Sequence, residues 1–446
     1  MMSLFAFQRH LQFSELPPST RQTLKRSLLD ILGIAAAARD TLATRALTRY
    51  ALEHYPSGAL ASRLFFDGRQ AHPLGASWVG GFCVDSIDAH EGHFASKGHA
   101  GATVVPALFA LVDASRERGR TISGEEFLSA LCIGYESALR AGSALMATTQ
   151  DYHASGAFSG VGVVCAGARL MGLDETHFRH ALGIAEYFGP RCPMMRLIDH
   201  PSMLRDAHGA GAFSGVNALM LAQAGLTGAP ASTVEDEGVA PFWGDLGERW
   251  EIDAQYFKLW PVCRWAQPAL TAVSQMMTSC PGGIEADAIE HIRVETFHES
   301  MRLQGHVPAS SDEAQYGLAF PLAAMIIRGR LGAGEVNGEA LHDEQILSLC
   351  QRIEIVEVAD LSARFPAEIL SRVHLTFKNG RRLSSDTVAA KGDPESPLSQ
   401  ADMLEKFRDL AGEHLADERL SAIIGAVYTL EQAEDCTALM NLVLEA

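Results

Sequence analysis

The sequence predicts a mainly α-helical protein with a smaller α+β part, in which a large all-helical domain is interrupted by a smaller inserted α+β domain. Apolar residues recur at helical spacing through most of the first two-thirds of the chain. Residues 291–298, 353–358 and 372–377 instead alternate with a period of two, as strands do. Helical patterns return after residue 397. We therefore expect residues 1–265 and 398–446 in the helical domain and residues 266–397 in the smaller one.

The helices are predicted from capping residues and from apolar spacing. Ser19-Thr20 offers an N-cap for a helix over residues 21–38, and Ser123 with Glu126 forms a capping-box pattern before the next long apolar run. Many of the predicted helices are rich in Ala and Gly, which allows close packing. Further helical patterns cover residues 106–115, 159–171, 175–187, 210–224, 314–327 and 400–410.

A hairpin is predicted inside the smaller domain. Asn379-Gly380 is a strong short-range signal for a tight turn, because both residues tolerate positive φ. It links the strand over residues 373–377 to the run that ends at Val388.

Composition excludes several classes of partner. The 446 residues carry 36 Lys and Arg against 54 Asp and Glu, a formal charge of −18. A net-acidic surface repels phosphate backbones and anionic lipid, so we expect no nucleic-acid or membrane partner. The apolar stretch at residues 31–38 is far shorter than the roughly 20 residues that span a bilayer, and we see no signal-peptide pattern. Eight cysteines without a Cys-x-x-Cys pair are typical of reduced thiols, which favours a cytoplasmic protein.

The densest polar cluster lies between residues 85 and 99. It contains three histidines (His90, His93 and His99), two aspartates (Asp85 and Asp88), Lys97 and Glu91. Such groups perform acid–base chemistry near neutral pH. His90 and His93 lack the spacing that places two histidines on one helical face, so we predict no metal site. Two alternatives stay open: a polar loop that caps the next helix, and metal-dependent hydrolysis through His90, His93 and Asp88.

Two further segments carry candidate binding groups. Tyr152 and His153 precede a helix of small residues, where the positive helix end attracts a carboxylate; a buried, satisfied histidine is the alternative. Lys258 and Arg264 flank a proline turn at the point where the predicted helical domain passes into the predicted α+β domain. Such basic groups suit a carboxylate-binding cleft. Cys263 between them is interpreted as a packing residue.

Glycine pairs at residues 160–162 and 209–211 do not predict a dinucleotide site. Neither follows a strand or completes the three-glycine spacing, so we interpret both as close helix packing.

Taken together, these segments resemble the MmgE/PrpD family of 2-methylcitrate dehydratase-like proteins. The matching stretches occur in family order along nearly the whole chain. They are residues 85–90 with 99–101, residues 153–156, residues 258–263, residues 314–320, and residues 391–399 with Lys406-Phe407.

The resemblance implies a helical domain with an α+β lid domain that closes over it, usually in a homodimer. It also implies chemistry without a cofactor on a small di- or tricarboxylate at the domain interface. Relatives include 2-methylcitrate dehydratase, cis-aconitate decarboxylase and iminodisuccinate epimerase, which all form or quench a carbanion-like centre beside a carboxylate.

The resemblance also assigns candidate catalytic residues. These match the family motifs at Asp85, Asp88, His99, His153 and Lys258. Four positions depart from the pattern: Ala89 stands in place of threonine, Ala100 of proline, Leu204 of lysine (with Arg205 beside it) and Phe320 of tyrosine (with Tyr316 one turn earlier). These departures argue against the decarboxylase and leave the substrate open.

We therefore predict a carbon–oxygen lyase in which His99 and His153 are the acid–base pair. Asp85 or Asp88 would orient an imidazole. Substrate binding is assigned to Lys258 and also to His90, Lys97, Tyr152, Arg205 and Arg264. Two alternatives remain: an epimerase, in which Tyr152 or Lys97 joins a histidine on the opposite face of one carbon, and an inactive substrate-binding homologue.

Overall fold

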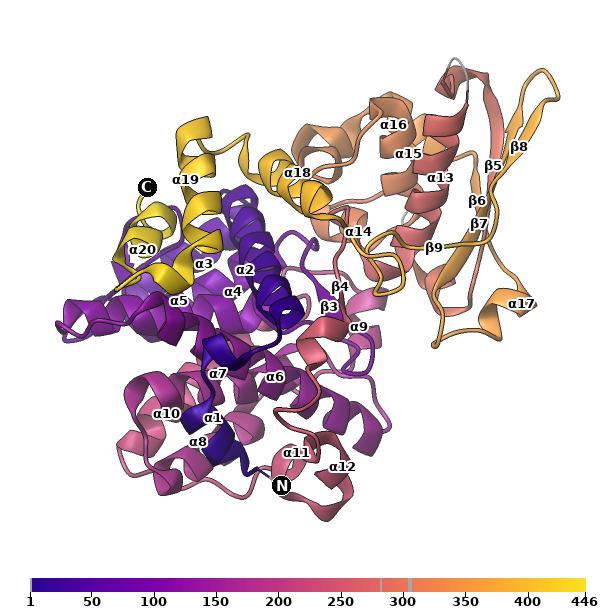
Figure 1. Cartoon of the computed structure of the whole chain (residues 1–446). Helices are drawn as coiled ribbons and strands as arrows, with labels where there is room; N and C mark the ends of the chain where they lie inside the picture. Colours follow the sequence, from indigo (N-terminus) through magenta and orange to yellow (C-terminus); the bar gives the residue numbers. More distant parts are fainter. Residues whose placement is uncertain (1, 281–282, 304–306) are drawn as a thin grey trace.

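The computed structural model describes residues 2–280, 283–303 and 307–446 and confirms a mainly helical protein with an α+β portion (Figure 1). Helices dominate the first part of the chain, and the main sheet lies at one end of the molecule, away from both termini. Within these described ranges, no helix combines the length and apolar character needed to cross a membrane.

The helical region is built around one large hydrophobic core. Its main helices are α1 (Leu4–His10), α2 (Pro18–Ala38), α3 (Leu42–His54), α4 (Pro73–Asp85), α5 (Gly101–Glu117), α6 (Gly124–Thr148), α7 (Gly156–Met171), α8 (Glu175–Phe188), α9 (Met194–Asp199) and α10 (His208–Gln223). Short helices α11 (Ser232–Glu235) and α12 (Ala240–Trp243) follow. Most of the long helices contribute fully buried side chains to the core, which is why several lack a distinct polar face.

Glycines allow the central helices to approach closely. A Cβ atom on Gly162 of α7 would lie 2.3 Å from the carbonyl oxygen of Gly134 on α6. On the other side of α7, a Cβ on Gly211 of α10 would lie 2.9 Å from the Cα of Gly156. The prediction that both glycine pairs serve helix packing is confirmed.

The second region has its own hydrophobic core around a sheet ordered β6-β5-β7-β8. β5 (Ile289–Thr296) pairs parallel with β6 (Ile353–Glu357) and antiparallel with β7 (Leu370–Phe377). The helices of this region are α13 (Gln267–Ser279), α14 (Ser311–Gln315), α15 (Ala319–Arg328), α16 (Glu344–Cys350) and α17 (Ala359–Ser362). Three buried side chains of α9 belong to this second core, although α9 lies between helices of the first region in the sequence.

The predicted hairpin is confirmed. β7 turns at Asn379-Gly380 into the antiparallel β8 (Arg382–Ser384), and Gly380 takes a φ of +83°. The run does not continue unbroken to Val388, because a separate short strand, β9 (Val388–Ala389), pairs with the beginning of β7.

Three details of the helix predictions were wrong. α2 starts at Pro18, so Ser19-Thr20 lies inside its first turn; proline already has the helical φ that this position needs. Ser123 does accept a hydrogen bond from the Glu126 amide, but the Glu126 carboxylate pairs with Arg169 and completes no capping box. The helix predicted over residues 314–327 is split into α14 and α15, since Pro321 has no amide hydrogen to continue the ladder.

The C-terminal helices return to the helical region. α18 (Gln400–Ala411) and α19 (Asp417–Tyr428) pack on α2, and α20 (Thr437–Leu444) packs on α19 (Figure 1). Ser399 and Asp402 form a complete capping box at the start of α18. Further along α18, the buried Lys406 pairs with Asp30 of α2 at 2.6 Å and donates to the Ala89 carbonyl at 2.7 Å. This contact ties α18 to the polar cluster.

Candidate active site

A cavity of about 810 Å³ lies where the two regions meet, and both supply its walls. The helical region contributes residues from the polar cluster, from α9 and from the segment before α10, whereas the second region contributes residues from 298–302, 316 and 365–369. The ionisable side chains on its buried part are Asp88, His93, His99, Asp206, Tyr256, Lys258, Cys263, Arg264 and Tyr316, and Tyr152 is half-buried. A pocket of this size at a domain interface is where a small-molecule site is expected.

Two short strands bring distant segments of the site together. β3 (Gly92–His93) pairs antiparallel with β4 (Gln255–Tyr256), and Gly92 stands opposite Tyr256. The loop that carries His99 is thereby fixed beside Lys258, although about 160 residues separate them. Gly92 is required at this contact, because a Cβ there would lie 2.4 Å from the Tyr256 hydroxyl.

Lys258 belongs to a buried network of charges. Its ammonium group donates to the Asp88 carboxylate and, at 3.3 Å, to the Asp88 carbonyl. The Gln315 side-chain oxygen accepts from the Asp88 amide and from Arg205, each at 2.8 Å. Arg205 also pairs with Asp312 at 2.8 Å. The network holds both basic side chains rigidly, although each is already partly neutralised by a carboxylate.

His99 is held as a neutral imidazole with one free nitrogen. Its Nδ1 lies 2.5 Å from the Glu91 carbonyl oxygen, which only accepts, so Nδ1 carries the proton. Burial, together with the nearby Lys258 charge, lowers the pKa of His99 to about 3. The unprotonated Nε2 lies 3.9 Å from the Asp206 carboxyl group. This arrangement leaves Nε2 available to accept a proton from a ligand.

Asp206 combines burial with hydrogen bonds to a helix start. It accepts from the Ser155 amide and hydroxyl, both at 3.2 Å, just before α7 begins. Burial and the neighbouring Asp88 charge nevertheless raise the pKa of Asp206 to about 6. A carboxyl group with this pKa can exchange a proton at neutral pH.

Arg264 presents unused hydrogen-bond donors. Its guanidinium group stacks over the rings of Tyr256 and Phe94, 4.8 and 5.5 Å from their centroids, and pairs with Asp393 through Nη2. Nε and Nη1 are buried and have no hydrogen-bond partner among the described residues. Because unpaired buried donors are costly, a bound anionic group is the natural partner for them.

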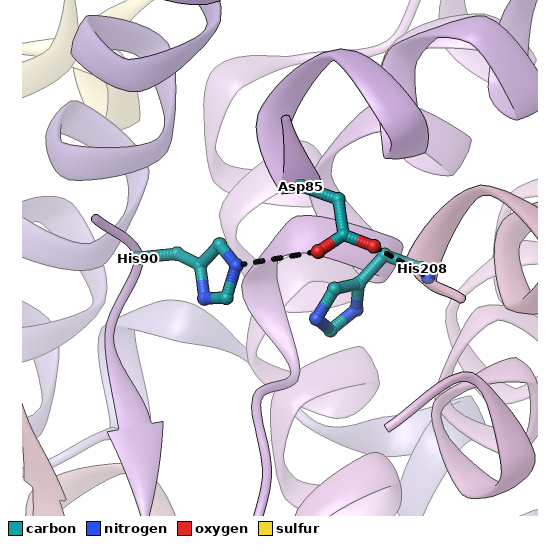
Figure 2. Close-up of side chains that lie close together, drawn as sticks. All are labelled: Asp85, His90 and His208. Carbon is teal, nitrogen blue, oxygen red and sulfur yellow. Dashed lines mark hydrogen bonds and ion pairs between the residues drawn. The ribbon is translucent and has the colours of Figure 1, made fainter. Parts of the chain in front are cut away.

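A second cluster lies beside the cavity. Asp85, His90 and His208 are fully buried, and their ligand-type atoms lie within 4.8 Å of one another (Figure 2). The His90 Nε2 is 3.8 Å from Asp85, whose other oxygen accepts from the His208 amide. Burial, and then His99, lowers the pKa values of His90 and His208, so both imidazoles are neutral. These are the residues that could hold a metal ion, but the positive charge of Lys258 disfavours a cation there.

The structure brings together some of the predicted site residues and not others. Those on the cavity wall are Asp88, Lys97, His99, Tyr152, Lys258 and Arg264. The predicted residues that do not line it are Asp85, His90, Arg205 and His153. His153 pairs through its backbone with Pro193, and its Nδ1 has no partner in the described ranges. Its catalytic role stays a prediction without a contact to the cavity.

The set predicted for metal-dependent hydrolysis is also not assembled. The His93 Nε2 lies 3.2 Å from Glu251, so His93 is engaged away from His90 and Asp88. The ligand-type cluster of the structure uses Asp85 and His208 with His90 instead.

Sequence reasoning missed several residues of the site, above all Asp206, Tyr256 and His208. Tyr256 could have been predicted, because it lies two residues before Lys258, a spacing that places both side chains on one side of an extended segment; both line the cavity. Asp206 lies between Arg205 and Ala207, which both adopt positive φ values, of 43° and 57°. Nothing in the sequence predicts this strained turn, apart from the charged residues Arg205 and Asp206 shortly before Gly209.

The departures from the family motifs have distinct structural positions. Phe320 is fully buried in the core of the second region, whereas Tyr316 lines the cavity. Leu204 is 70% exposed, but its neighbour Arg205 is buried in the charge network. Tyr316 and Arg205 therefore supply polar groups next to two of the altered positions.

Comparison with known families decides the relationship. The model of the MmgE/PrpD N-terminal domain matches residues 3–245, and that of the MmgE/PrpD C-terminal domain matches residues 260–431. The chain belongs to the MmgE/PrpD family.

Curated relatives of this MmgE/PrpD protein are similar over almost their whole length. A cis-aconitate decarboxylase-like protein, oryM, from Aspergillus oryzae is 24% identical over 97% of this chain and 95% of the relative. Cis-aconitate decarboxylase from Homo sapiens is 24% identical over 97% and 92%. The enzyme of the same name from Aspergillus terreus is 22% identical over 97% and 93%.

Proposed function

We propose that this protein is a cofactor-independent lyase that eliminates water from a small di- or tricarboxylate. The observation that carries the proposal is that one cavity is lined both by Arg264, with its unused donors, and by His99, with its free Nε2. Family membership supports a lyase reaction on a tricarboxylate, since the relatives named above are cis-aconitate decarboxylases or, for oryM, decarboxylase-like; the loss of water rather than carbon dioxide is our proposal.

Binding is assigned to the two basic residues of the cavity. The unpaired Nε and Nη1 of Arg264 would donate hydrogen bonds to a bound carboxylate group, which the charge of the guanidinium group also attracts. Lys258 would contribute a point charge to a second carboxylate, with Asp88 holding the ammonium group in place.

Proton transfer is assigned to His99 and Asp206. His99 Nε2 would remove the proton from the carbon next to a bound carboxylate, and the protonated Asp206 would give its proton to the departing hydroxyl group, which leaves as water. The two electrons of the C–H bond form the new double bond. Because 3.9 Å separates the two groups, the proton on His99 can return to Asp206 and restore the starting state.

The test is a panel of citrate-, methylcitrate-, aconitate- and iminodisuccinate-like acids with products identified by mass spectrometry. We expect loss of 18 mass units from a hydroxy acid, unchanged by a chelator. Loss of carbon dioxide instead would assign the decarboxylase reaction of the relatives. Ligand-induced thermal stabilisation without turnover of any acid would indicate an inactive binding homologue.

Matched histidine variants test the assignment of the base. His99→Gln is expected to lower kcat roughly 10²–10⁴-fold, whereas His153→Gln, the same change beside the cavity, should have a much smaller effect. Normal turnover by His99→Gln would remove His99 from the mechanism, and an equal loss in His153→Gln would support the acid–base pair predicted from the family motifs.

An epimerase is the second candidate, because Lys97 and Tyr152 line the same cavity as His99. The Lys97 ammonium group lies 5.8 Å from the centre of the Tyr152 ring, and Lys97 adopts a strained φ of 47°. Incubation in deuterated buffer separates the two reactions: an epimerase exchanges the α-hydrogen of recovered substrate without loss of water.

A further inference from the structure

The hydroxyl group of Tyr316 is a buried hydrogen-bond donor that the proton transfer described above does not use. Tyr316 lines the cavity and is itself buried. Its hydroxyl oxygen has no hydrogen-bond partner within residues 2–280, 283–303 and 307–446. An unpaired buried hydroxyl destabilises the folded protein, because burial removes the water that would otherwise bond to it. A hydrogen bond to a bound ligand offsets this cost.

Contacts on several sides hold Tyr316 in place. Its amide donates to the Asp312 carbonyl at 3.0 Å, at the end of α14. The carbonyl of the preceding residue, Gln315, accepts from the Cys263 amide at 2.8 Å. The Tyr316 ring lies against the guanidinium group of Arg205, which is 5.8 Å from the ring centre. A donor fixed in this way needs little reorganisation when charge develops on a ligand.

The surroundings of Tyr316 keep its hydroxyl group protonated. Burial, and then the charges of Asp88, Asp206 and Asp85, raise the pKa of Tyr316 well above its usual value. Of these charges, that of Asp88 acts most strongly, and Asp88 also pairs with Lys258. Tyr316 therefore belongs to the Lys258 side of the cavity. A protonated phenol donates one hydrogen bond and has no charge that would repel a carboxylate.

The proposed reaction creates negative charge that such a donor can stabilise. When His99 removes the proton, part of the electron pair of the C–H bond moves onto the neighbouring carboxylate before the hydroxyl group leaves. Lys258 attracts this carboxylate throughout, whereas a neutral donor gains most as the extra charge grows. Stabilisation that increases toward the transition state raises kcat.

We propose that Tyr316 is a catalytic residue whose hydroxyl group donates a hydrogen bond to the carboxylate beside the reacting carbon and stabilises the negative charge that develops there. The inference rests on the proposed function, because it concerns the same proton removal by His99. Tyr316 keeps its own proton throughout, so no covalent bond forms or breaks at the phenol.

The first test removes only the oxygen atom, in Tyr316→Phe. Loss of one such donor typically lowers kcat about 10²–10³-fold, and we expect this loss with KM changed by less than about threefold. Because the hydroxyl has no partner in the free protein, the variant should unfold at the same or a higher temperature. Tyr428→Phe is the matched control, since Tyr428 is a half-buried tyrosine of α19 outside the cavity lining; it should keep full activity.

A second test uses binding and does not depend on turnover. In 3-nitropropane-1,2-dicarboxylate, a nitro group replaces one terminal carboxylate of propane-1,2,3-tricarboxylate. Its ionised nitronate form has the planar geometry and spread charge of the carboxylate after proton removal. By calorimetry, the unaltered protein should bind the nitronate at least about 100-fold more tightly than the tricarboxylate. Tyr316→Phe should lose most of this difference and keep its affinity for the tricarboxylate.

The outcomes distinguish the role of Tyr316 from the proposed function. Normal kcat in Tyr316→Phe, equal losses of affinity for the two compounds, or a lowered unfolding temperature would overturn the role of Tyr316 and leave the lyase proposal intact. Loss of carbon dioxide instead of water, with the same effect of Tyr316→Phe, would overturn the loss of water and support Tyr316. If no acid is turned over, the lyase proposal fails, and the two affinities still test Tyr316. If neither compound binds, both proposals fail.

Discussion

Replacement of Arg264 is the most direct test of how the cavity recognises its ligand. Arg264→Gln removes the charge and both unused donors from a buried position. Hydrogen bonds between a charged donor and a carboxylate contribute about 1.5–3 kcal/mol each. At the lower limit, loss of the two bonds costs about 3 kcal/mol, or roughly a 150-fold rise in KM.

Arg264→Gln also affects folding stability, and this effect must be distinguished from the loss of ligand binding. Arg264 also neutralises the buried Asp393, and loss of one member of a buried ion pair typically costs about 3–5 kcal/mol of folding stability. Arg264→Gln combined with Asp393→Asn removes both charges and should restore most of that stability. Arg264→Lys keeps the positive charge but loses the planar guanidinium group with its several donors, so an intermediate rise in KM is expected.

The assay combines steady-state kinetics with calorimetry on a non-reacting tricarboxylate such as propane-1,2,3-tricarboxylate. We expect the double variant to be folded, with KM and the dissociation constant raised about 150-fold and a smaller change in kcat. A folded double variant whose KM rises less than threefold would refute the assignment of Arg264 as the carboxylate-binding residue.

Two further predictions concern charges around the site. The hydrogen bond and charge of Glu357 raise the pKa of His298 at the cavity rim. The ion pair is therefore formed below pH 6.5 while Glu357 stays ionised, and it is lost as pH rises through the raised pKa of His298. NMR titration of Glu357→Gln should show the pKa of His298 falling back, and an unchanged titration would exclude the pair. Lys406→Met leaves the buried Asp30 without its partner and should lower the free energy of unfolding by about 3–5 kcal/mol. Asp30→Asn combined with Lys406→Met should recover most of this loss. Urea unfolding measures the stability of the single and the double variant, and a loss below 1 kcal/mol in the single variant would contradict the buried pair.

Local features of the fold were predictable because they depend on neighbours in the chain. The period-two strands, the Asn379-Gly380 turn and the helix over residues 400–410 follow from backbone preferences and apolar spacing that act over a few residues. The helix predicted over residues 314–327 is interrupted for the same kind of local reason, because Pro321 has no amide hydrogen to bond to the preceding turn.

The sequence by itself determined the architecture and the candidate basic and imidazole groups, since motif residues such as His99, Lys258 and Arg264 can be read directly from the chain. Only the tertiary structure decided which of them share a cavity. In the structure, Asp206 lies 3.9 Å from His99, and apolar side chains of α9 line the cavity, whereas His153 and Arg205 do not line it. The physical reason is that the pairing of β3 with β4 and the meeting of the two cores depend on contacts between residues more than 100 positions apart, which no local pattern encodes.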